Sequence, residues 1–265
     1  MNTPSLGVWL VGASGRMGQA IQRVADEAGD IHFCGSIGSR GADRSVEEHG
    51  YPVVVIDFSS PDGTFAACDF AARHGYPLVS GTTGLGMPHE VRFTELAQYN
   101  AVLHANNMSA GVHVLAALVQ QAAATLCDWD TEIVELHHRM KKDSPSGTAL
   151  LLAQAADAGR NLQGEAHWRR SREGLVGARP AGEMGIFGVR GGDVVGEHTV
   201  FLFGSGERLE LTHRATDRTI FARGAVRAAD CLSRVLMRLA RTAGRPVERE
   251  ARKQAARYVL SVGLS

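Results

Sequence analysis

The stretch Leu6–Gly18, L-G-V-W-L-V-G-A-S-G-R-M-G, decides the fold expected of this chain. Residues 6–11 form a short apolar run, which predicts a buried parallel strand. Three glycines follow at the spacing G-x-x-G-x-x-G, and a helical pattern then runs to Gly29. The apolar face of that helix carries Met17, Ile21, Val24, Ala25 and Ala28. A strand, a glycine turn and a helix in this order are typical of dinucleotide sites in doubly wound α/β sheets.

Each glycine of the turn has an expected role. Gly12 permits the tight turn, Gly15 lets the backbone approach a pyrophosphate, and Gly18 lets the helix lie close to the sheet. Arg16 lies inside the turn and could reach a phosphate. The spacing is a variant of G-x-G-x-x-G and is weak evidence alone, so an ordinary glycine-rich turn is the alternative.

The residues after the second strand bear on the choice of cofactor. The expected strand covers Ile31–Ile37, and an NAD site usually ends this strand with an acid that binds the ribose hydroxyls. Here Ser39 and Arg40 stand in that place. Because a hydroxyl and a guanidinium suit a 2′-phosphate, NADPH is predicted to be preferred, with NADH possible.

Three more strands are expected in the first half of the chain, at Val53–Phe58, Tyr76–Ser80 and Ala101–Ala105. Helices are expected at Gly63–His74 and Pro88–Gln98, and the link 38–52 has little room for one. The strand at residues 6–11 and these three strands end in G-A-S-G, D-F-S-S, G-T-T-G and A-N-N-M-S, respectively. Ligands bind at the carboxyl ends of such strands, so this ordered set predicts a cofactor trough. The alternative is that these residues only form turns.

The second half suggests a different sheet with fewer helices. Strands are expected at Thr131–Leu136, Met184–Arg190, Glu197–Phe203 and Arg208–Ala215. Helices are expected at Gly111–Leu126, Pro145–Ala158, Ile220–Arg241 and Val247–Val262. The fold class is therefore α/β, a Rossmann-like doubly wound parallel sheet plus a smaller α+β domain with a mixed or antiparallel sheet. The first domain would cover 1–108, completed by 218–265, and a substrate-binding and oligomerisation domain would cover 109–217.

A dense group of cations lies in Glu135–Ala149, E-L-H-H-R-M-K-K-D-S-P-S-G-T-A. Ser144 is the expected N-cap of the next helix and Pro145 its first residue. The backbone N–H groups of Ser146, Gly147 and Thr148 would then face outward and attract an anion. The stretch therefore predicts a site for a small polyanion.

Composition excludes several classes of protein. With 28 basic and 28 acidic residues and a pI near 7.2, general nucleic-acid binding has no support. No apolar stretch approaches the ~20 residues of a membrane span, and no signal peptide is apparent, so a cytoplasmic location is expected. The cysteines Cys34, Cys68, Cys127 and Cys231 form no C-x-x-C pair and are expected to be buried free thiols without a metal or redox role. No metal site is expected from His137, His138 and Glu135 either, because adjacent side chains at a strand end diverge.

Five motifs together resemble one family. They are G-A-S-G-R-M-G, D-F-S-S-P-D-G-T, G-T-T-G, the whole Glu135–Ala149 stretch and G-D-V-V-G-E-H-T. In this order, from about Gly7 to Ala229, they resemble the dihydrodipicolinate (4-hydroxy-tetrahydrodipicolinate) reductases of bacterial lysine and diaminopimelate biosynthesis. The resemblance implies hydride transfer from NAD(P)H to a cyclic dicarboxylic imine, in a homotetramer.

The resemblance also implies roles for individual residues. His137 would be the general acid and base, and Lys141 a second catalytic residue that donates a proton. His138, Gly147 and Thr148 would bind the substrate carboxylates. Cofactor contacts would fall on Gly12, Ala13, Ser14, Gly15, Arg16, Met17, Gly81, Thr82, Thr83, Ala105, Asn106, Asn107 and Met108. The chain departs from the family pattern in its short link after the second strand, in Gly38 where relatives of dual specificity carry an acid, and in its ending from about Arg241.

Other residues and other functions stay open. Arg139 and Lys142 suit solvated or salt-bridged roles, and Asp143 suits a role in fixing the loop. His198 and His213 are expected to pack within strands, and Arg218 is as consistent with a structural role as with a ligand contact. One alternative function is a different two-domain NADP-dependent oxidoreductase. The other is a non-enzymatic NADP(H)-binding sensor, which would not need the His137 and Lys141 pair.

Overall fold

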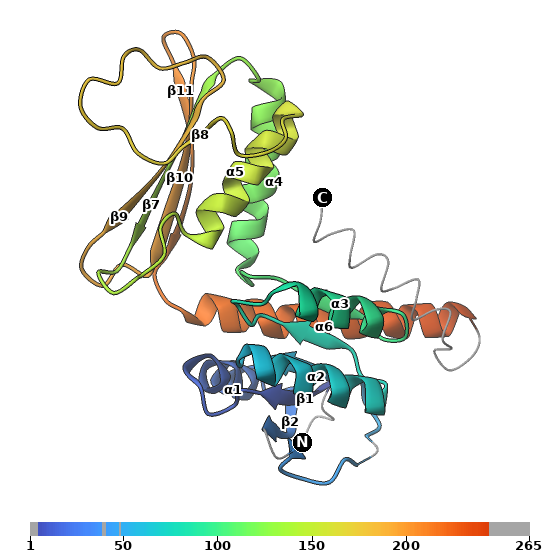
Figure 1. Ribbon diagram of the computed structural model, residues 1–265. Helices are drawn as coiled ribbons and strands as arrows, with labels where there is room; N and C mark the ends of the chain where they lie inside the picture. Colours follow the sequence, from blue (N-terminus) through green and yellow to red (C-terminus); the bar gives the residue numbers. More distant parts are fainter. Residues whose placement is uncertain (1–4, 39–40, 48, 244–265) are drawn as a thin grey trace. The chain divides into compact units, whose positions relative to one another are not determined.

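The computed structural model describes residues 5–38, 41–47 and 49–243, and its elements are labelled in Figure 1. The chain divides into two compact units. Unit 1 comprises Met1–Met108 and Phe221–Ser265, and unit 2 comprises Ser109–Ile220. None of the described helices is long and apolar enough to cross a membrane. The helix expected at Val247–Val262 lies outside the described residues.

Unit 1 is built on a six-stranded sheet in the order β3-β2-β1-β4-β5-β6. The strands are β1 (Leu6–Val11), β2 (Ile31–Gly38), β3 (Gly41–Ala42), β4 (Val53–Asp57), β5 (Leu78–Ser80) and β6 (Val102–His104). All neighbours pair in parallel except β2 and β3. From β1 the chain goes first to β2 and then returns to β4 on the other side of β1. The carboxyl ends of β1 and β4 therefore flank the switch point where such sheets bind ligands.

Helices cover both faces of this sheet. They are α1 (Arg16–Ala28), α2 (Pro61–His74), α3 (Met87–Ala97) and α6 (Thr219–Ala243). Side chains alternate along β1, so Leu6, Val8 and Leu10 pack with α1 and α6. Trp9 and Val11 face the other way and pack with α2 and α3. The predicted doubly wound parallel sheet is confirmed. In the described part of the link 38–52 the structure forms only β3, and no helix.

Unit 2 holds a five-stranded mixed sheet in the order β11-β10-β7-β9-β8. Its strands are β7 (Asp130–His137), β8 (Trp168–Arg169), β9 (Met184–Arg190), β10 (Gly196–Phe203) and β11 (Arg208–Ala215). β9 pairs in parallel with β7 and β8, whereas β10 is antiparallel to β7 and β11. Helices α4 (Ala110–Thr125) and α5 (Gly147–Arg160) form a core with the sheet. The predicted mixed sheet is confirmed.

The predicted start of α5 is wrong by two residues. Ser146, not Ser144, is the N-cap, and its hydroxyl accepts the N–H of Ala149 at 3.2 Å. Helical residues begin at Gly147, and Pro145 precedes the helix after a cis peptide bond. The N–H of Ser146 donates to Glu135 at 3.1 Å instead of facing outward. The start of α5 therefore coincides with a hydrogen bond to Glu135 on the preceding strand, which local cap preferences cannot predict.

Candidate active site

In unit 2, the end of β7 places a histidine against a buried carboxylate. Glu135 and His137 are two residues apart on one strand, so their side chains lie on the same face. Nδ1 of His137 lies 2.5 Å from Oε2 of Glu135. The Glu135 side chain is fully buried, and that of His137 is 12% exposed. The histidine is therefore held from inside the unit while part of its ring reaches solvent.

Arg190 on β9 neutralises this carboxylate. Its Nη1 donates to Oε2 of Glu135 at 2.8 Å, and its Nη2 donates to Oε1 at 2.7 Å. Burial alone would raise the pKa of Glu135, but the hydrogen bonds from His137 and Arg190 outweigh it and lower the pKa to about 2. Glu135 is thus an anion throughout the neutral range.

His198 lies opposite Glu135 on β10. Its Nε2 is 2.9 Å from the hydroxyl of Ser146, and its ring centroid is 5.2 Å from that of His137. Burial, and then the charge of His137, lower the pKa of His198 to about 3. His198 is therefore a neutral, buried ring that supports the start of α5, in keeping with the packing role expected for it.

Lys141 lies in the loop that follows β7. Its Nζ donates to both oxygens of Asp143, at 2.8 and 2.9 Å. Arg190 donates to the backbone carbonyl of Asp143 at 2.7 Å, and the N–H of Gly191 donates to the carbonyl of His137 at 2.9 Å. The loop is therefore tied to the end of β9, and Asp143 helps to fix it as the sequence suggested. Arg139 and Lys142 are exposed.

The surroundings of His138 are cationic. Loss of hydration lowers its pKa, and the charges of Arg218, His137, Lys141 and Arg190 lower it further, in that order. Arg218 thus adds a positive charge near His138. No motif next to Arg218 in the sequence predicted this. Gly147 and Thr148 form the first turn of α5, where helix geometry provides no intrahelical acceptor for the N–H groups. Cations and a helix N-terminus at one place suit a substrate with two carboxylates.

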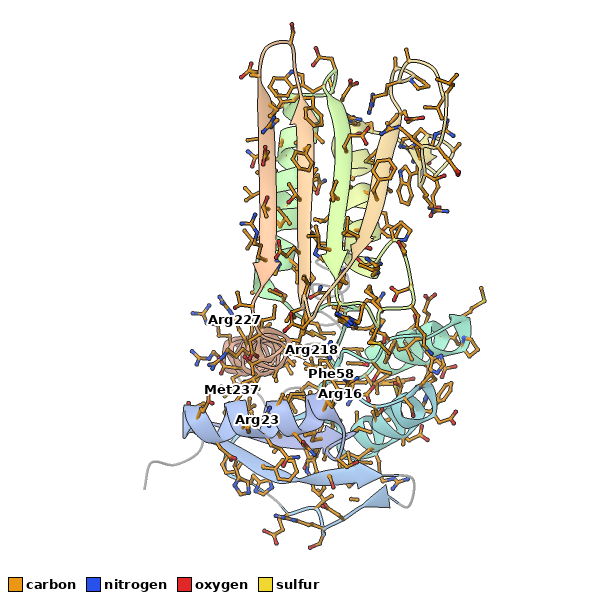
Figure 2. The ribbon with its side chains drawn as sticks, turned by 90° about the vertical axis from the view of Figure 1, so that its left-hand side faces the viewer. Arg16, Arg23, Phe58, Arg218, Arg227 and Met237 are labelled. Atoms are coloured by element: carbon orange, nitrogen blue, oxygen red, sulfur yellow. The ribbon has the colours of Figure 1, made fainter. Side chains whose placement is uncertain are left out.

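In unit 1, two glycines of the turn after β1 lie too close to other backbone atoms to carry a side chain. Gly12 adopts a φ of 83°, and a Cβ there would overlap the carbonyl of Phe58. A Cβ on Gly18 would overlap backbone atoms of Gly12 and Ala13. Gly15 is the N-cap of α1. The exposed residues Ser14, Gly15 and Arg16 therefore place a helix N-terminus at the switch point, where a pyrophosphate fits. Figure 2 labels Arg16 at the start of α1 and Phe58 just after β4.

The other expected cofactor residues follow β5 and β6, and they differ in their surroundings. Gly81 packs against the Phe58 ring, where a Cβ would overlap it. Thr82 is buried, and its hydroxyl accepts the N–H of Ser59 at 2.9 Å. Met108 is buried in the core of unit 1, whereas Thr83 and Asn106 are exposed. Ala105 and Asn107 are half-buried. Ser39 and Arg40 lie outside the described residues.

Asp57 at the end of β4 was not singled out from the sequence. Its buried carboxylate accepts hydrogen bonds from the hydroxyls of Ser59, Thr64 and Ser80, at 2.5, 2.8 and 2.8 Å. It therefore ties together the ends of β4 and β5 and the start of α2. The signal was present as an acid that ends an apolar strand and precedes two serines. Within the described residues, no three side chains gather in a way that could bind a metal ion.

Comparisons with known proteins point to one family over both units. The family described as "Dihydrodipicolinate reductase, N-terminus" matches residues 6–108, and "Dihydrodipicolinate reductase, C-terminus" matches residues 111–241. A 4-hydroxy-tetrahydrodipicolinate reductase from Methylocella silvestris is 43% identical over 242 residues, which are 83% of this chain and 89% of the relative. One from Archaeoglobus fulgidus is 43% identical over 246 residues, which are 86% of this chain and 94% of the relative.

A solved structure is similar in fold. It is the dipicolinate-bound dihydrodipicolinate reductase from Paenisporosarcina sp. TG-14, with a TM-score of 0.67 and 23% identity. The alignment covers 86% of this chain and 94% of that one. The family matches and the two relatives confirm the motif-based prediction of the family. With a glycine turn that fits a pyrophosphate in unit 1 and family matches over both units, the chain belongs to the dihydrodipicolinate reductase family, the NAD(P)H-dependent oxidoreductases of lysine and diaminopimelate biosynthesis.

Proposed function

We propose that this chain reduces 4-hydroxy-tetrahydrodipicolinate to tetrahydrodipicolinate, with His137 and Lys141 as its catalytic residues. The observation that carries the assignment is the grouping in unit 2 of a strand-end histidine, a lysine and a helix N-terminus. The family relationship supplies the reaction, and this grouping supplies the chemistry that the reaction needs.

The substrate would be held by charge. Its two carboxylates would meet the N–H of Gly147, the hydroxyl and N–H of Thr148, and the side chain of His138. Charge-assisted hydrogen bonds of this kind contribute about 1.5–3 kcal/mol each. The cation of Lys141 adds to the attraction once substrate competes with Asp143 for it. Three or four such contacts are enough for micromolar affinity after the cost of ordering is met.

Proton transfer would fall to His137. The 4-hydroxyl group would leave as water, NAD(P)H would supply the hydride when bound, and a proton must reach the reduced ring. Histidine suits this task because its ordinary pKa of about 6.5 allows transfer near neutral pH. Lys141, whose ammonium group is paired with Asp143 in the same loop, would act as the second proton donor.

The cofactor would be bound by unit 1. Its phosphates would lie at the glycine turn Gly12–Met17, and its remaining contacts would fall on Gly81–Thr83 and Ala105–Met108. NADPH would be preferred because Arg40 and Ser39 stand where NAD sites carry an acid, and Arg16 adds a second cation. Unit 2 would be the substrate-binding and oligomerisation domain of a cytoplasmic homotetramer. No nucleic acid or membrane partner is proposed.

The decisive experiment supplies NADPH and the freshly made product of dihydrodipicolinate synthase, and follows the loss of NADPH absorbance. Turnover that depends on both supports the proposal. Turnover only with other imines or carbonyls would favour a different NADP-dependent oxidoreductase. Binding of NADPH without turnover of any such substrate would favour a sensor.

A further inference from the structure

We propose that Glu135 is a positioning residue which, held in place by Arg190, fixes the proton of neutral His137 on Nδ1 and leaves Nε2 to exchange a proton with substrate. This inference rests on the proposed function, because it takes His137 as the acid and base. It adds a residue that touches neither substrate nor cofactor.

The hydrogen bonds around Glu135 leave its carboxylate little freedom. Oε2 accepts from His137 and from Nη1 of Arg190, and Oε1 accepts from Nη2 of Arg190 and from the N–H of Ser146. These four bonds come from β7, β9 and the start of α5. A carboxylate has about four acceptor positions, so each position is used. Rotation of the group would break several bonds at once in a buried site.

The charge state of Glu135 then decides which nitrogen of His137 carries the proton. An ionised carboxylate only accepts hydrogen bonds, and the low pKa of Glu135 keeps it ionised. A nitrogen 2.5 Å from such an oxygen must be the donor. In neutral His137 the proton therefore lies on Nδ1, and Nε2 presents its lone pair.

Two glycines leave space for this arrangement. Gly188 is paired with Glu135 between β9 and β7, and a Cβ there would lie 2.4 Å from the hydroxyl of Ser144, 2.8 Å from Oε1 of Glu135 and 3.2 Å from Nη1 of Arg190. A Cβ on Gly196 would lie 3.0 Å from Nε2 of His137. These distances are shorter than ordinary contacts, so larger residues at either glycine would displace the neighbouring side chains. The sheet is thus built around the Glu135 and His137 contact.

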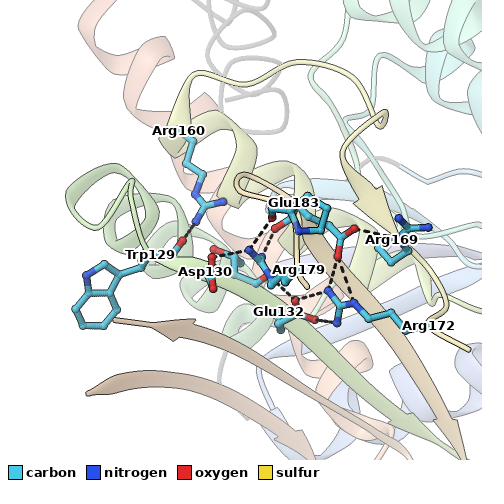
Figure 3. A network of polar contacts seen from close by, with 10 residues as sticks. Trp129, Asp130, Glu132, Arg160, Arg169, Arg172, Arg179 and Glu183 are labelled. Carbon is cyan, nitrogen blue, oxygen red and sulfur yellow. Dashed lines mark hydrogen bonds and ion pairs between the residues drawn. The ribbon is translucent and has the colours of Figure 1, made fainter. Parts of the chain in front are cut away.

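The same strand carries a comparable ion pair without a histidine. Glu132 accepts two bonds from Arg172, at 2.7 and 2.9 Å, and one from Arg179 at 3.0 Å (Figure 3). These bonds tie the segment 169–183 to β7. Glu132 tests whether the loss of an arginine-paired carboxylate on β7 is by itself enough to lower kcat, although Glu132 is 15% exposed and Glu135 is fully buried. Glu132 is therefore the matched control.

The first experiment reads the His137 tautomer directly. Imidazole nitrogen NMR of the wild-type enzyme, assigned by comparison with His137→Gln, is recorded at a pH where the ring is neutral. We expect Nδ1–H in the wild type and a mixture of tautomers in Glu135→Gln. A wild-type ring with the proton on Nε2 would overturn the proposal, and this measurement requires no variant at position 135 to fold.

The second experiment compares the kinetics of Glu135→Gln and Glu132→Gln. We expect kcat to fall about 10²-fold in Glu135→Gln, within the range lost when acid–base catalysis fails. Its KM should change only a few-fold, and Glu132→Gln should keep wild-type kcat. Unchanged kcat in Glu135→Gln, or an effect confined to KM through the bond to Ser146, would overturn the proposal. A wild type that fixes Nδ1–H but reduces no substrate would instead refute the proposed function.

Discussion

The hydroxyl of Ser146 lies 2.9 Å from Nε2 of His198, although 52 residues separate them in the chain. The same hydroxyl caps α5 by accepting the N–H of Ala149. A buried ring on β10 thus supports the helix N-terminus to which we assign the substrate carboxylates. Since burial holds the pKa of His198 near 3, the support depends on a neutral ring.

The unfolding free energy should therefore fall as the pH drops below about 6.5. The unfolded chain takes up a proton on His198 near its ordinary pKa of 6.5, whereas the folded protein resists protonation until about pH 3. The stability present above pH 6.5 is lost through this window, at up to ~1.4 kcal/mol per pH unit for one proton. Urea unfolding between pH 7.5 and 5 should show a shallower dependence in His198→Asn. Equal slopes in wild type and variant would contradict the assignment.

Removal of Arg190 should destabilise unit 2 strongly. Arg190→Met leaves the buried carboxylate of Glu135 without a counter-charge, which costs about 3–5 kcal/mol. Arg92→Met is the control, because Arg92 pairs with the exposed Asp69 and such pairs contribute at most ~1 kcal/mol. Denaturant unfolding of the two variants measures the difference, and similar losses would show that the Glu135 pair behaves as a surface pair.

Acid should weaken the ion pair between Glu135 and Arg190. The folded pKa of Glu135, about 2, lies below its ordinary value of 4.5. The stability that it contributes is complete above pH 4.5 and is lost as the pH falls from there towards 2. Glu135→Gln should remove this component of acid unfolding, as followed by circular dichroism. Parallel acid transitions in the wild type and the variant would argue against it.

Gly18→Ala should weaken NADPH binding. The added Cβ would overlap backbone atoms of Gly12 and Ala13, which cannot move without opening the turn. Gly50→Ala is the control, because a Cβ at Gly50 meets no atom within 4 Å. Titration of NADPH fluorescence should show at least a ~10-fold higher Kd for Gly18→Ala, equivalent to about 1.4 kcal/mol. Equal affinities would place the cofactor elsewhere.

Lys141 and its neighbour Lys142 should differ in their effects on catalysis. Lys141 is bound to Asp143 beside the end of β7, whereas Lys142 is exposed. Lys141→Ala should lower kcat/KM about 10²-fold or more, since it removes a proposed proton donor and a cation near the substrate. Lys142→Ala should stay within a few-fold of the wild type. Steady-state rates decide between the two, and equal effects would mean that only total charge matters.

Local sequence patterns were enough to predict the glycine turn, strand β7 and the family. The run Leu6–Val11 with its glycine turn fixed the dinucleotide fold, because only glycines fit so close to Phe58 and Ala13. The alternation of polar and apolar residues over Thr131–Leu136 predicted β7, with His137 and His138 at its end. The Glu135–Ala149 motif indicated the family, which the relatives confirm.

Only the tertiary structure decided how that motif is held. Arg190 and His198 come from strands 55 and 63 residues after Glu135, and strand pairing alone brings them beside it. The N-cap of α5 is Ser146 and not the predicted Ser144, and the N–H of Ser146 donates to Glu135. Local propensity describes neighbours along the chain, whereas a buried carboxylate is satisfied by whichever donors the sheet places around it.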